Sequence, residues 1–399
     1  MRGYDTAWFH VAPASWEAVA LGRLAKPVKR TNVPDARLLS LYLGEGIVPY
    51  KTDKVVHATS EDTSAYQLVL PGDLVLNNQQ AWRGSVAVSR LRGIVSPAYV
   101  VCQLSESLDR RFAEYLFSCS AARFPYVNSS RGVGDIQRGL AWPLLKAQKF
   151  PVPPSETQAG IADYLDRETA RIDELVAEQE RLIELLRERL DAEADALFQS
   201  SKKARHTVVK RVLRPLSRPA VPGLGVVTAF RDGIVTLRSN RREEGYTFSS
   251  AESGYQEIRP GDFVFHALDG FAGAVGVSDS HGNATPVYHV CEAVALSDDL
   301  TYIARLLRHL GRSGFLATQA PNVRERAVDF RNWSTFGRLP IVLPPAEEQR
   351  RVAAHFDDQV AKINSLIDAT EQFVELARER REALITAAVT GQIDVREMA

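Results

Sequence analysis

The sequence has few cysteines and no long apolar run. Three cysteines occur among 399 residues, and they form neither a metal-ligand spacing nor an even disulfide set. No stretch of about 18 uncharged apolar residues is present, which argues against a membrane span. The segment Met1–Ala20 carries acidic side chains and tryptophans where a signal segment would be apolar. These absences predict a cytoplasmic protein without a membrane partner.

Motifs for several common chemistries are also missing. None of the ten lysines stands two residues after an Asp or Glu, the spacing that the common metal-dependent nuclease core uses. The chain has no Asn/Asp/Ser-Pro-Pro-aromatic motif of an amino-methyltransferase and no phosphate loop with Gly-Lys-Ser/Thr. The eight histidines show no metal-ligand spacing. We therefore expect no catalytic residues, no metal and no bound cofactor in this chain.

An internal repeat is the strongest positive feature. Pro71-Gly72-Asp73 recurs 189 residues later as Pro260-Gly261-Asp262. A second block recurs at a spacing of 191, where Pro153-Pro154, Gln158 and Arg187-Glu188-Arg189 return as Pro344-Pro345, Gln349 and Arg378-Glu379-Arg380. This unit is far longer than a solenoid repeat. Together with the chain length, it predicts two copies of a globular module, each followed by a long helix.

The predicted architecture is α+β with an internal pseudo-twofold axis. We expect a first module over 1–152, a helix over 153–200, a second module over 201–342, a helix over 343–391 and a tail over 392–399. Within the modules, short strands such as Leu41–Tyr50 alternate with Gly and Pro, which favours a twisted antiparallel sheet with a few helices. The two modules would be separated by a long antiparallel two-helix coiled coil.

Charge differs between the modules and the helices. Residues 1–154 carry 18 basic and 12 acidic side chains, and residues 201–340 carry 19 and 13. Residues 155–200 carry 5 basic and 13 acidic side chains, and residues 341–399 carry 7 and 11. Two basic modules are a weak indication of a polyanionic partner, although an excess of this size also lies within ordinary scatter.

The coiled coil is predicted from apolar residues at alternating steps of four and three. Pro153-Pro154 blocks helix before Ser155, and Ser155 with Gln158 has the spacing of a capping box. The residues expected to pair the helices are Ile172, Val176, Ile183, Leu186, Leu190, Ile363, Ile367, Val374 and Ile385. Two equivalent stripes related by a pseudo-dyad would run antiparallel.

Two further features of the helices bear on partners. Gln179 and Thr370 are polar at matching seam positions, where they either fix the register or face solvent at the rim. Leu175, Leu182 and Leu185 are apolar in excess of what a two-helix seam needs. They leave a face for helices of another protein.

In the order of its motifs, the whole chain resembles the specificity subunit of type I restriction–modification systems. The resemblance lies in two Pro-Pro-x-x-x-Gln steps into long helices, within residues 150–158 and 339–349, in the helix end at residues 387–393, and in the opening at residues 16–22. It implies two target recognition domains, each reading one half of a split double-stranded DNA sequence. It also implies helices that act as a spacer and dock two modification subunits. Those subunits bring S-adenosylmethionine and methylate adenine, and restriction subunits join them to cut.

Candidate DNA contacts follow from residue chemistry, since Arg fits guanine and Asn or Gln fits adenine. In the first module they are Asn77, Asn78, Gln79, Gln80 and Arg83, and then Tyr126, Asn128, Ser130, Arg131 and Arg138. In the second module they are His266, Asp269, Asn322, Arg324, Arg326 and Arg331. The residues expected to contact phosphates are Lys51, Lys54, Arg238, Arg241 and Arg242. A polar hairpin turn remains an alternative interpretation of the amide-rich loop, and a solvated surface charge remains one for each single cation.

Two other functions remain open from the residues alone. One is a two-module protein-interaction scaffold that does not bind DNA. The other is a self-contained nuclease or methyltransferase whose site matches no known motif. Gel shift with modification subunits would separate the first from DNA recognition, and incubation of the chain alone with DNA and S-adenosylmethionine would test the second.

Overall fold

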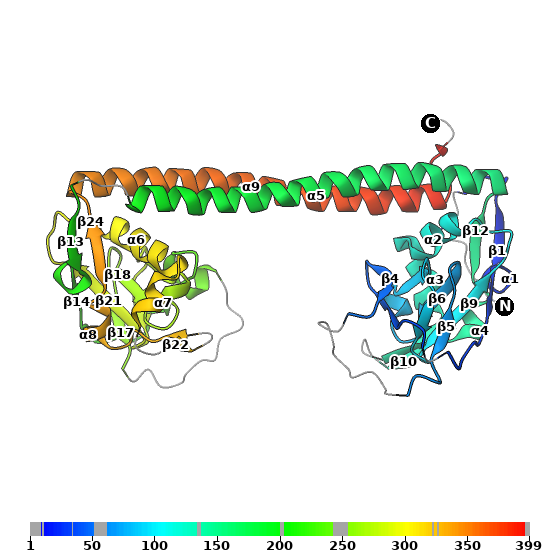
Figure 1. The fold of residues 1–399 in the computed structure, drawn as a ribbon, viewed down its shortest axis with the longest axis horizontal. Coiled ribbons are helices and arrows are strands. Elements are labelled where there is room, and N and C mark those ends of the chain that lie inside the picture. The colour runs from blue at the N-terminus through cyan, green and yellow to red at the C-terminus, as the bar shows by residue number, and fades with distance from the viewer. Residues whose placement is uncertain are drawn as a thin grey trace. The chain divides into compact units, whose positions relative to one another are not determined.

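The chain divides into two compact units, each combining one module with half of each long helix. The computed structural model describes residues 9, 12–33, 35–51, 62–133, 137–199, 203–241, 254–320, 323–324 and 327–395. Unit 1 comprises Met1–Glu180 and Glu371–Ala399, and unit 2 comprises Arg181–Thr370. Figure 1 shows the strand-rich modules and the two long helices. None of the helices within the described residues is long and apolar enough to cross a membrane.

The two modules are built from the same set of antiparallel strand pairs. Each has one four-stranded sheet, in the order β2-β9-β6-β7 in the first module and β14-β21-β18-β19 in the second. Four two-stranded pairs surround each sheet: β1-β12, β3-β4, β5-β8 and β10-β11 in the first module and β13-β24, β15-β16, β17-β20 and β22-β23 in the second. The α+β prediction and its duplication are confirmed.

The element bounds follow the repeat closely. The strands of the first module are β1 (Glu17–Ala20), β2 (Ala25–Pro27), β3 (Leu39–Tyr42), β4 (Gly46–Pro49), β5 (Gln67–Val69), β6 (Asp73–Asn77), β7 (Val86–Val88), β8 (Gly93–Val95), β9 (Tyr99–Leu104), β10 (Ser130–Val133), β11 (Gln137–Leu140) and β12 (Lys149–Val152). Its helices are α1 (Leu21–Leu24), η3 (Ala81–Arg83), α2 (Arg110–Ser118), η4 (Ser120–Ala122), α3 (Arg123–Asn128) and α4 (Trp142–Leu145).

The second module repeats this series. Its strands are β13 (Arg205–Val208), β14 (Leu213–Pro215), β15 (Val227–Ala229), β16 (Val235–Leu237), β17 (Gln256–Ile258), β18 (Phe263–His266), β19 (Val275–Val277), β20 (Gly282–Ala284), β21 (Tyr288–Ala293), β22 (Val323–Arg324), β23 (Ala327–Val328) and β24 (Pro340–Leu343). Its helices are η5 (Val209–Arg211), η6 (Arg238–Asn240), η7 (Gly270–Ala272), α6 (Leu300–Arg312), α7 (Phe315–Gln319) and α8 (Trp333–Phe336). The long helices are α5 (Ser155–Gln199) and α9 (Ala346–Val389).

The segment Leu41–Tyr50, expected to be a single strand, is a hairpin. Strands β3 and β4 pair across a turn, with Leu41 opposite Ile47. Gly44 and Gly46 adopt positive φ angles of 80° and 72°. Glycine reaches this region without the steric cost that other residues meet. The two glycines therefore turn the chain where the apolar pattern alone indicated continuity.

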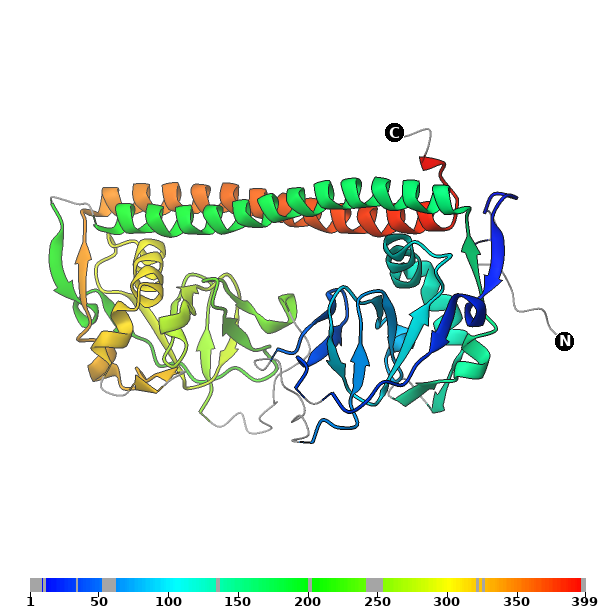
Figure 2. The ribbon, with the colours of Figure 1, turned by 45° about the vertical axis from the view of Figure 1, so that its right-hand side comes forward.

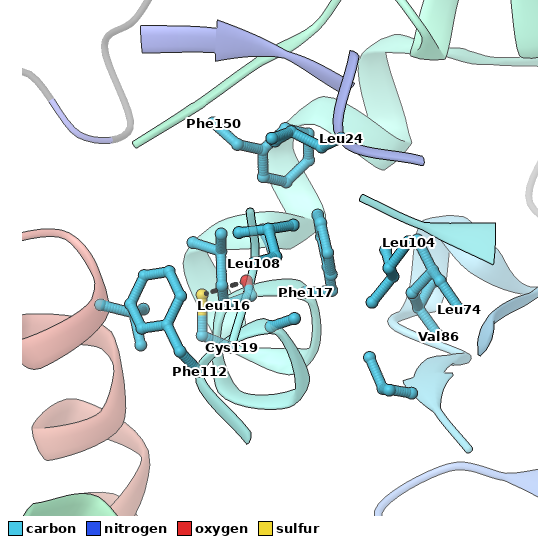
Figure 3. Packing of buried hydrophobic residues seen from close by; sticks show 14 of the residues in the cluster. Leu24, Leu74, Val86, Leu104, Leu108, Phe112, Leu116, Phe117, Cys119 and Phe150 are labelled. Atoms are coloured by element: carbon cyan, nitrogen blue, oxygen red, sulfur yellow. Dashed lines mark hydrogen bonds between the residues drawn. The ribbon is translucent and has the colours of Figure 1, made fainter. Parts of the chain in front are cut away.

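The core of the first module lies between α2 and its four-stranded sheet (Figure 3). Asp109 caps α2 by accepting hydrogen bonds from the backbone N–H groups of Arg111 (2.9 Å) and Phe112 (3.0 Å). The buried face of α2 includes Phe112 and Phe117, and the ring of Phe117 meets Phe150 edge-on with centroids 5.2 Å apart. Phe150 on β12 thus ties the strand that leads into α5 to the module core.

The glutamine of each Pro-Pro-x-x-x-Gln step is buried and anchors a long helix to its module. The Oε1 of Gln158 accepts from the backbone N–H of Asp109 at 2.8 Å, and its Nε2 donates to the carbonyl of Pro153 at 2.9 Å. Gln349 repeats this with Asp299 N–H (2.9 Å) and Pro344 O (2.9 Å). The capping-box interpretation of Ser155 and Gln158 is therefore wrong, because this glutamine reaches into another part of the module instead.

The two long helices pack against each other in antiparallel fashion within each unit, as predicted. In unit 1, Asp173 pairs with Arg381 at 2.8 Å and Glu180 with Arg378 at 2.6 Å. In unit 2, Ile183, Ile363 and Ile367 form a buried cluster with Leu186 and Leu190 against it. Farther along the same unit, Phe198 meets Phe356 edge-on with ring centroids 5.4 Å apart. Residue numbers rise on α5 as they fall on α9, as an antiparallel pair requires.

The remaining residues expected to pair the helices lie at half-buried or buried positions. Ile172 and Val176 are half-buried on α5, and Val374 is 5% exposed on α9. Ile385 is buried in the core cluster of the first module, where it joins residues of α2. The hydroxyl of Thr370 donates to Leu366 O at 2.7 Å within its own helix. The Thr370 hydroxyl therefore forms its hydrogen bond within α9 and not across the helix pair.

Candidate nucleic-acid interface

The amide-rich loop of the first module is a structured turn between β6 and β7. The side-chain oxygen of Asn77 accepts from Gln79 N–H at 3.1 Å, which closes the turn. Asn78 is bound to β11 twice, because both its backbone carbonyl and its side-chain oxygen accept from Leu140 N–H at 3.0 Å. Gln79 is exposed and Gln80 is half-buried. The loop can therefore be both a structured turn and a recognition site. Asn77 and Asn78 hold its backbone in place, and Gln79 is exposed to solvent.

An aromatic residue joins this loop to the β10-β11 hairpin. Trp82 lies in η3, and its indole N–H donates to Gln79 O at 3.0 Å. The guanidinium carbon of Arg83 lies 4.7 Å from the centroid of its ring, and that of Arg138 on β11 lies 4.9 Å away. Both contacts are of the cation–π type. Two arginines 55 residues apart in sequence are thereby gathered at one ring.

The other predicted residues of the first module lie around the start of the hairpin. Asn128 ends α3 and is exposed, as is Arg131 on β10. The hydroxyl of Ser130 donates to Tyr126 O at 2.8 Å. Tyr126 is only 1% exposed and donates its own hydroxyl to Phe117 O at 2.8 Å, and its burial raises its pKa well above the usual value. The expectation that Tyr126 contacts DNA is wrong, since it is a core residue.

Strand β10 lies on the side of the first module away from its segment of α5 (Figures 1 and 2), and the loop before β7 is joined to its partner strand β11 by the bond from Leu140 N–H to Asn78 O. The hairpin pairs Ser130 with Leu140 and Gly132 with Arg138. Its counterpart β22-β23 pairs Val323 with Val328 in the second module. Both modules therefore carry a short hairpin on the side away from their helix segments.

The equivalent loop of the second module uses different side chains for the same turn. His266 Nδ1 accepts from the backbone N–H groups of Leu268 (3.2 Å) and Asp269 (3.0 Å), and the first of these bonds is equivalent to that from Gln79 N–H to Asn77 in the first copy. The ring meets Tyr288 edge-on at 4.7 Å, and burial lowers the pKa of His266. Asp269 forms an ion pair with Arg231 at 2.9 Å. Arg231 is a residue of this loop surface that the sequence pattern did not single out.

Of the remaining candidates in the second module, one forms an ion pair within the chain and the others lie wholly or partly outside the described residues. Arg331 forms an ion pair with Asp329 at 2.7 Å, two positions earlier, and this raises the pKa of Arg331. Arg324 lies on β22, where the backbone alone is described. Asn322 and Arg326 lie outside the described residues. The structure thus brings His266 and Asp269 together in one turn.

The three expected phosphate partners that the structure describes are engaged within the chain. Lys51 forms an ion pair with Glu45, and Arg241 one with Asp232. Arg238 Nε donates to the hydroxyl of Thr228 at 3.3 Å. Lys54 and Arg242 lie outside the described residues. Exposed ion pairs of this kind contribute about 0–1 kcal/mol, so they would not prevent these cations from exchanging partners.

The outer face of each long helix carries exposed apolar side chains at equivalent positions. Leu175, Leu182 and Leu185 on α5 are 37%, 41% and 50% exposed. At a spacing of 191, α9 presents Leu366, Phe373 and Leu376 with 55%, 44% and 63% exposure. The residues on α9 were not singled out from the sequence, although the repeat spacing points directly to them. Within each unit, the helix pair thus retains apolar surface that no described residue covers.

No cluster of three or more His, Cys, Asp or Glu that could hold a metal occurs among the described residues. All three cysteines are buried, and burial raises the pKa of Cys119 to about 11 and that of Cys102 to about 12. A thiol with a raised pKa is a poor nucleophile at neutral pH.

Comparison with known proteins gives a match at the level of structure. No protein-family model matches the chain, and no curated protein matches its sequence. A chain of a type I restriction–modification system, solved in work on complex assembly and conformational transition, is similar over 96% of this chain and 99% of its own length, with a TM-score of 0.74 and 16% identity. The HsdS subunit from Thermoanaerobacter tengcongensis is similar over 96% and 98%, with a TM-score of 0.56 and 16% identity. Over nearly its whole length, the chain therefore has the fold of a type I restriction–modification specificity subunit.

Proposed function

We propose that this chain is the DNA specificity subunit of a type I restriction–modification complex. The observation that carries the proposal is the full-length match in fold to such a subunit, joined to a duplicated module whose two loop surfaces differ in chemistry. Each module would bind one half of a bipartite double-stranded DNA target. The chain itself would catalyse nothing and would act in the cytoplasm.

The first loop surface suits DNA because its side chains match base edges and phosphates. Gln79 and Gln80 offer amides, and Arg83, Arg131 and Arg138 offer guanidinium groups. The second surface offers His266 and Asp269 at the equivalent turn. Two copies of one scaffold with different loop chemistry are what a target with two unlike halves requires.

The long helices supply a spacer of suitable length. Helix α5 has 45 residues and α9 has 44. At 1.5 Å per residue each helix is about 66–68 Å long, which is roughly two turns of B-DNA at about 34 Å each. We infer that the helix pair sets the separation of the half-sites.

The duplicated apolar faces of the helices support docking of two copies of one partner. Leu182 and Leu185 on α5 recur as Phe373 and Leu376 on α9, so the repeat offers the same surface twice. We propose that two modification subunits cover these faces, bring S-adenosylmethionine and methylate adenine. Restriction subunits would join that complex to cut DNA.

The test is to express the full chain together with the modification subunits of its own genome and to map methylated adenines with and without it. We expect methylation at a motif with two defined halves separated by a fixed number of unspecified bases. A complex that forms but neither binds duplex DNA nor methylates a bipartite motif would instead favour the scaffold function. Methylation or cleavage by the purified chain alone would favour the enzyme.

A further inference from the structure

Two arginines of the first module, Arg83 and Arg138, meet at the ring of Trp82. Trp82 is held by the hydrogen bond from its indole N–H to Gln79 O at 3.0 Å. The guanidinium groups of Arg83 and Arg138 lie 4.7 and 4.9 Å from its ring centroid. The ring therefore limits the positions that these two long side chains can adopt. Ordering before binding reduces the entropy lost when the complex forms.

Guanine is the base that such a group matches. Its O6 and N7 atoms in the major groove accept two parallel hydrogen bonds from one guanidinium fork, the commonest specific contact in protein–DNA complexes. Arg is always charged, and its planar guanidinium group both stacks on aromatic rings and matches paired acceptors with its fork of N–H groups. Arg83 is exposed, and Arg138 is half-buried on the hairpin beside it.

The second module lacks this group at the equivalent place. At a spacing of 189, Trp82 becomes Phe271 and Arg83 becomes Ala272. The loop presents Asp269 instead, two positions earlier, with Arg231 bound to it. A carboxylate accepts from the N4 amino group of cytosine and repels the O6 and N7 acceptors of guanine. The two equivalent turns therefore differ in the base edge that they fit.

We propose that Trp82 is a positioning residue that aligns Arg83 and Arg138 to read guanine in one half-site, and that the other half-site has no such guanine reader at the equivalent loop. This inference rests on the proposed DNA-specificity function and deepens it. It assigns guanine as the base read by the loop before β7, and it gives Trp82 a role although Trp82 does not itself bond to the base.

The experiment selects duplexes from a randomised pool with the full chain in complex with its modification subunits, and sequences the bound fraction. For the original chain we expect two half-sites, with a guanine strongly preferred in one. Arg83→Ala should reduce that guanine preference by roughly 10- to 100-fold while leaving the other half-site unchanged. The unchanged half-site reports that the variant is folded and assembled.

Two substitutions of Trp82 distinguish its positioning of the arginines from its structural hydrogen bond to Gln79. Trp82→Leu and Trp82→Phe both delete the indole N–H, but only phenylalanine retains an aromatic face for the guanidinium groups. We expect Trp82→Leu to lose the guanine preference as Arg83→Ala does, and Trp82→Phe to keep it within about threefold.

Three results would overturn the inference. If Arg83→Ala weakens binding to all sequences equally, the arginine contacts phosphate and reads no base. If Trp82→Phe loses the preference as fully as Trp82→Leu, the aromatic face has no positioning role. If the affected position is an A·T pair, the base assignment is wrong. A chain that binds no duplex at all in the complex would overturn the proposed function as well.

Discussion

At the scale of single residues, Gln158 shows how a motif can be found before its purpose is known. The repeat made Gln158 and Gln349 stand out, yet local spacing suggested a helix cap. The structure gives each glutamine a backbone N–H donor 49 or 50 residues earlier in the chain, at Asp109 and Asp299. A pattern confined to nearby residues cannot reveal a partner so distant in sequence.

Replacing Gln158 with leucine should destabilise unit 1. The side chain is 2% exposed, and its loss leaves the N–H of Asp109 and the carbonyl of Pro153 without their partner in a buried place. We expect the free energy of unfolding to fall by about 1–3 kcal/mol, measured by urea denaturation. Gln103→Leu is the control: Gln103 is exposed on β9, so its replacement should change stability by no more than about 0.5 kcal/mol. Equal effects of both changes would contradict the anchoring role.

His289 should make unit 2 sensitive to mild acid. Burial against Phe336, whose ring stacks at 4.9 Å, lowers the pKa of His289, while a hydrogen bond to Phe330 O at 2.7 Å opposes the shift. The folded state thus holds a neutral ring, and the unfolded chain takes up a proton first, near pH 6.5. Stability is complete above that pH and decreases as the pH falls below it, until the lowered folded-state pKa is reached, by at most about 1.4 kcal/mol per pH unit for one histidine.

Hydrogen exchange of β18 and β21 at pH 7.5 and 5.5 measures this effect. Burial also lowers the pKa of His266 and His309, so His289→Gln should reduce the acid loss of stability without abolishing it. Unit 1 has Val100 at the equivalent position and serves as the internal control. If His289→Gln leaves the difference between the two pH values unchanged, another group is responsible.

At the scale of elements, the long helices were the most predictable part of the chain. Their seam repeats within a few residues, and local periodicity is enough to orient a helix. The recognition surface was much less predictable. Trp82 meets Arg138 only because η3 and β11 are neighbours in the fold, and two residues 56 positions apart show no local periodic pattern in the sequence. Arg231 beside Asp269 was missed for the same reason.

Adjacent residues on α9 separate folding from docking. Val374 is 5% exposed in the seam, whereas Phe373 is 44% exposed on the outer face. Val374→Asp places a carboxylate in the seam and should cost about 3 kcal/mol or more, seen as a lower midpoint of thermal unfolding by circular dichroism. Phe373→Asp should leave that midpoint nearly unchanged but weaken binding of the modification subunits about tenfold, measured by calorimetry. An outcome in which Phe373→Asp binds those subunits normally would remove this face from the docking surface.

At the scale of the whole molecule, the internal duplication made the fold predictable from the sequence. Two copies of one sequence pattern predicted two copies of one fold, and every sheet pairing described in the first module has its counterpart in the second. The target sequence is a different matter. Contacts to bases depend on loop side chains that the two copies do not share, such as Asn77 and His266, which close equivalent turns with different chemistry.

The shared residue at each helix start has a mechanical consequence. Asp109 caps α2 with its carboxylate and holds Gln158 with its backbone N–H, and Asp299 does the same for α6 and Gln349. One amino acid thus links the start of the module helix to the glutamine of the long helix in each copy, so the Pro-Pro step does not act as a free hinge. A force applied to the first turns of α5 would be transmitted directly to the core beneath α2, and any bending of the molecule under load would have to occur elsewhere.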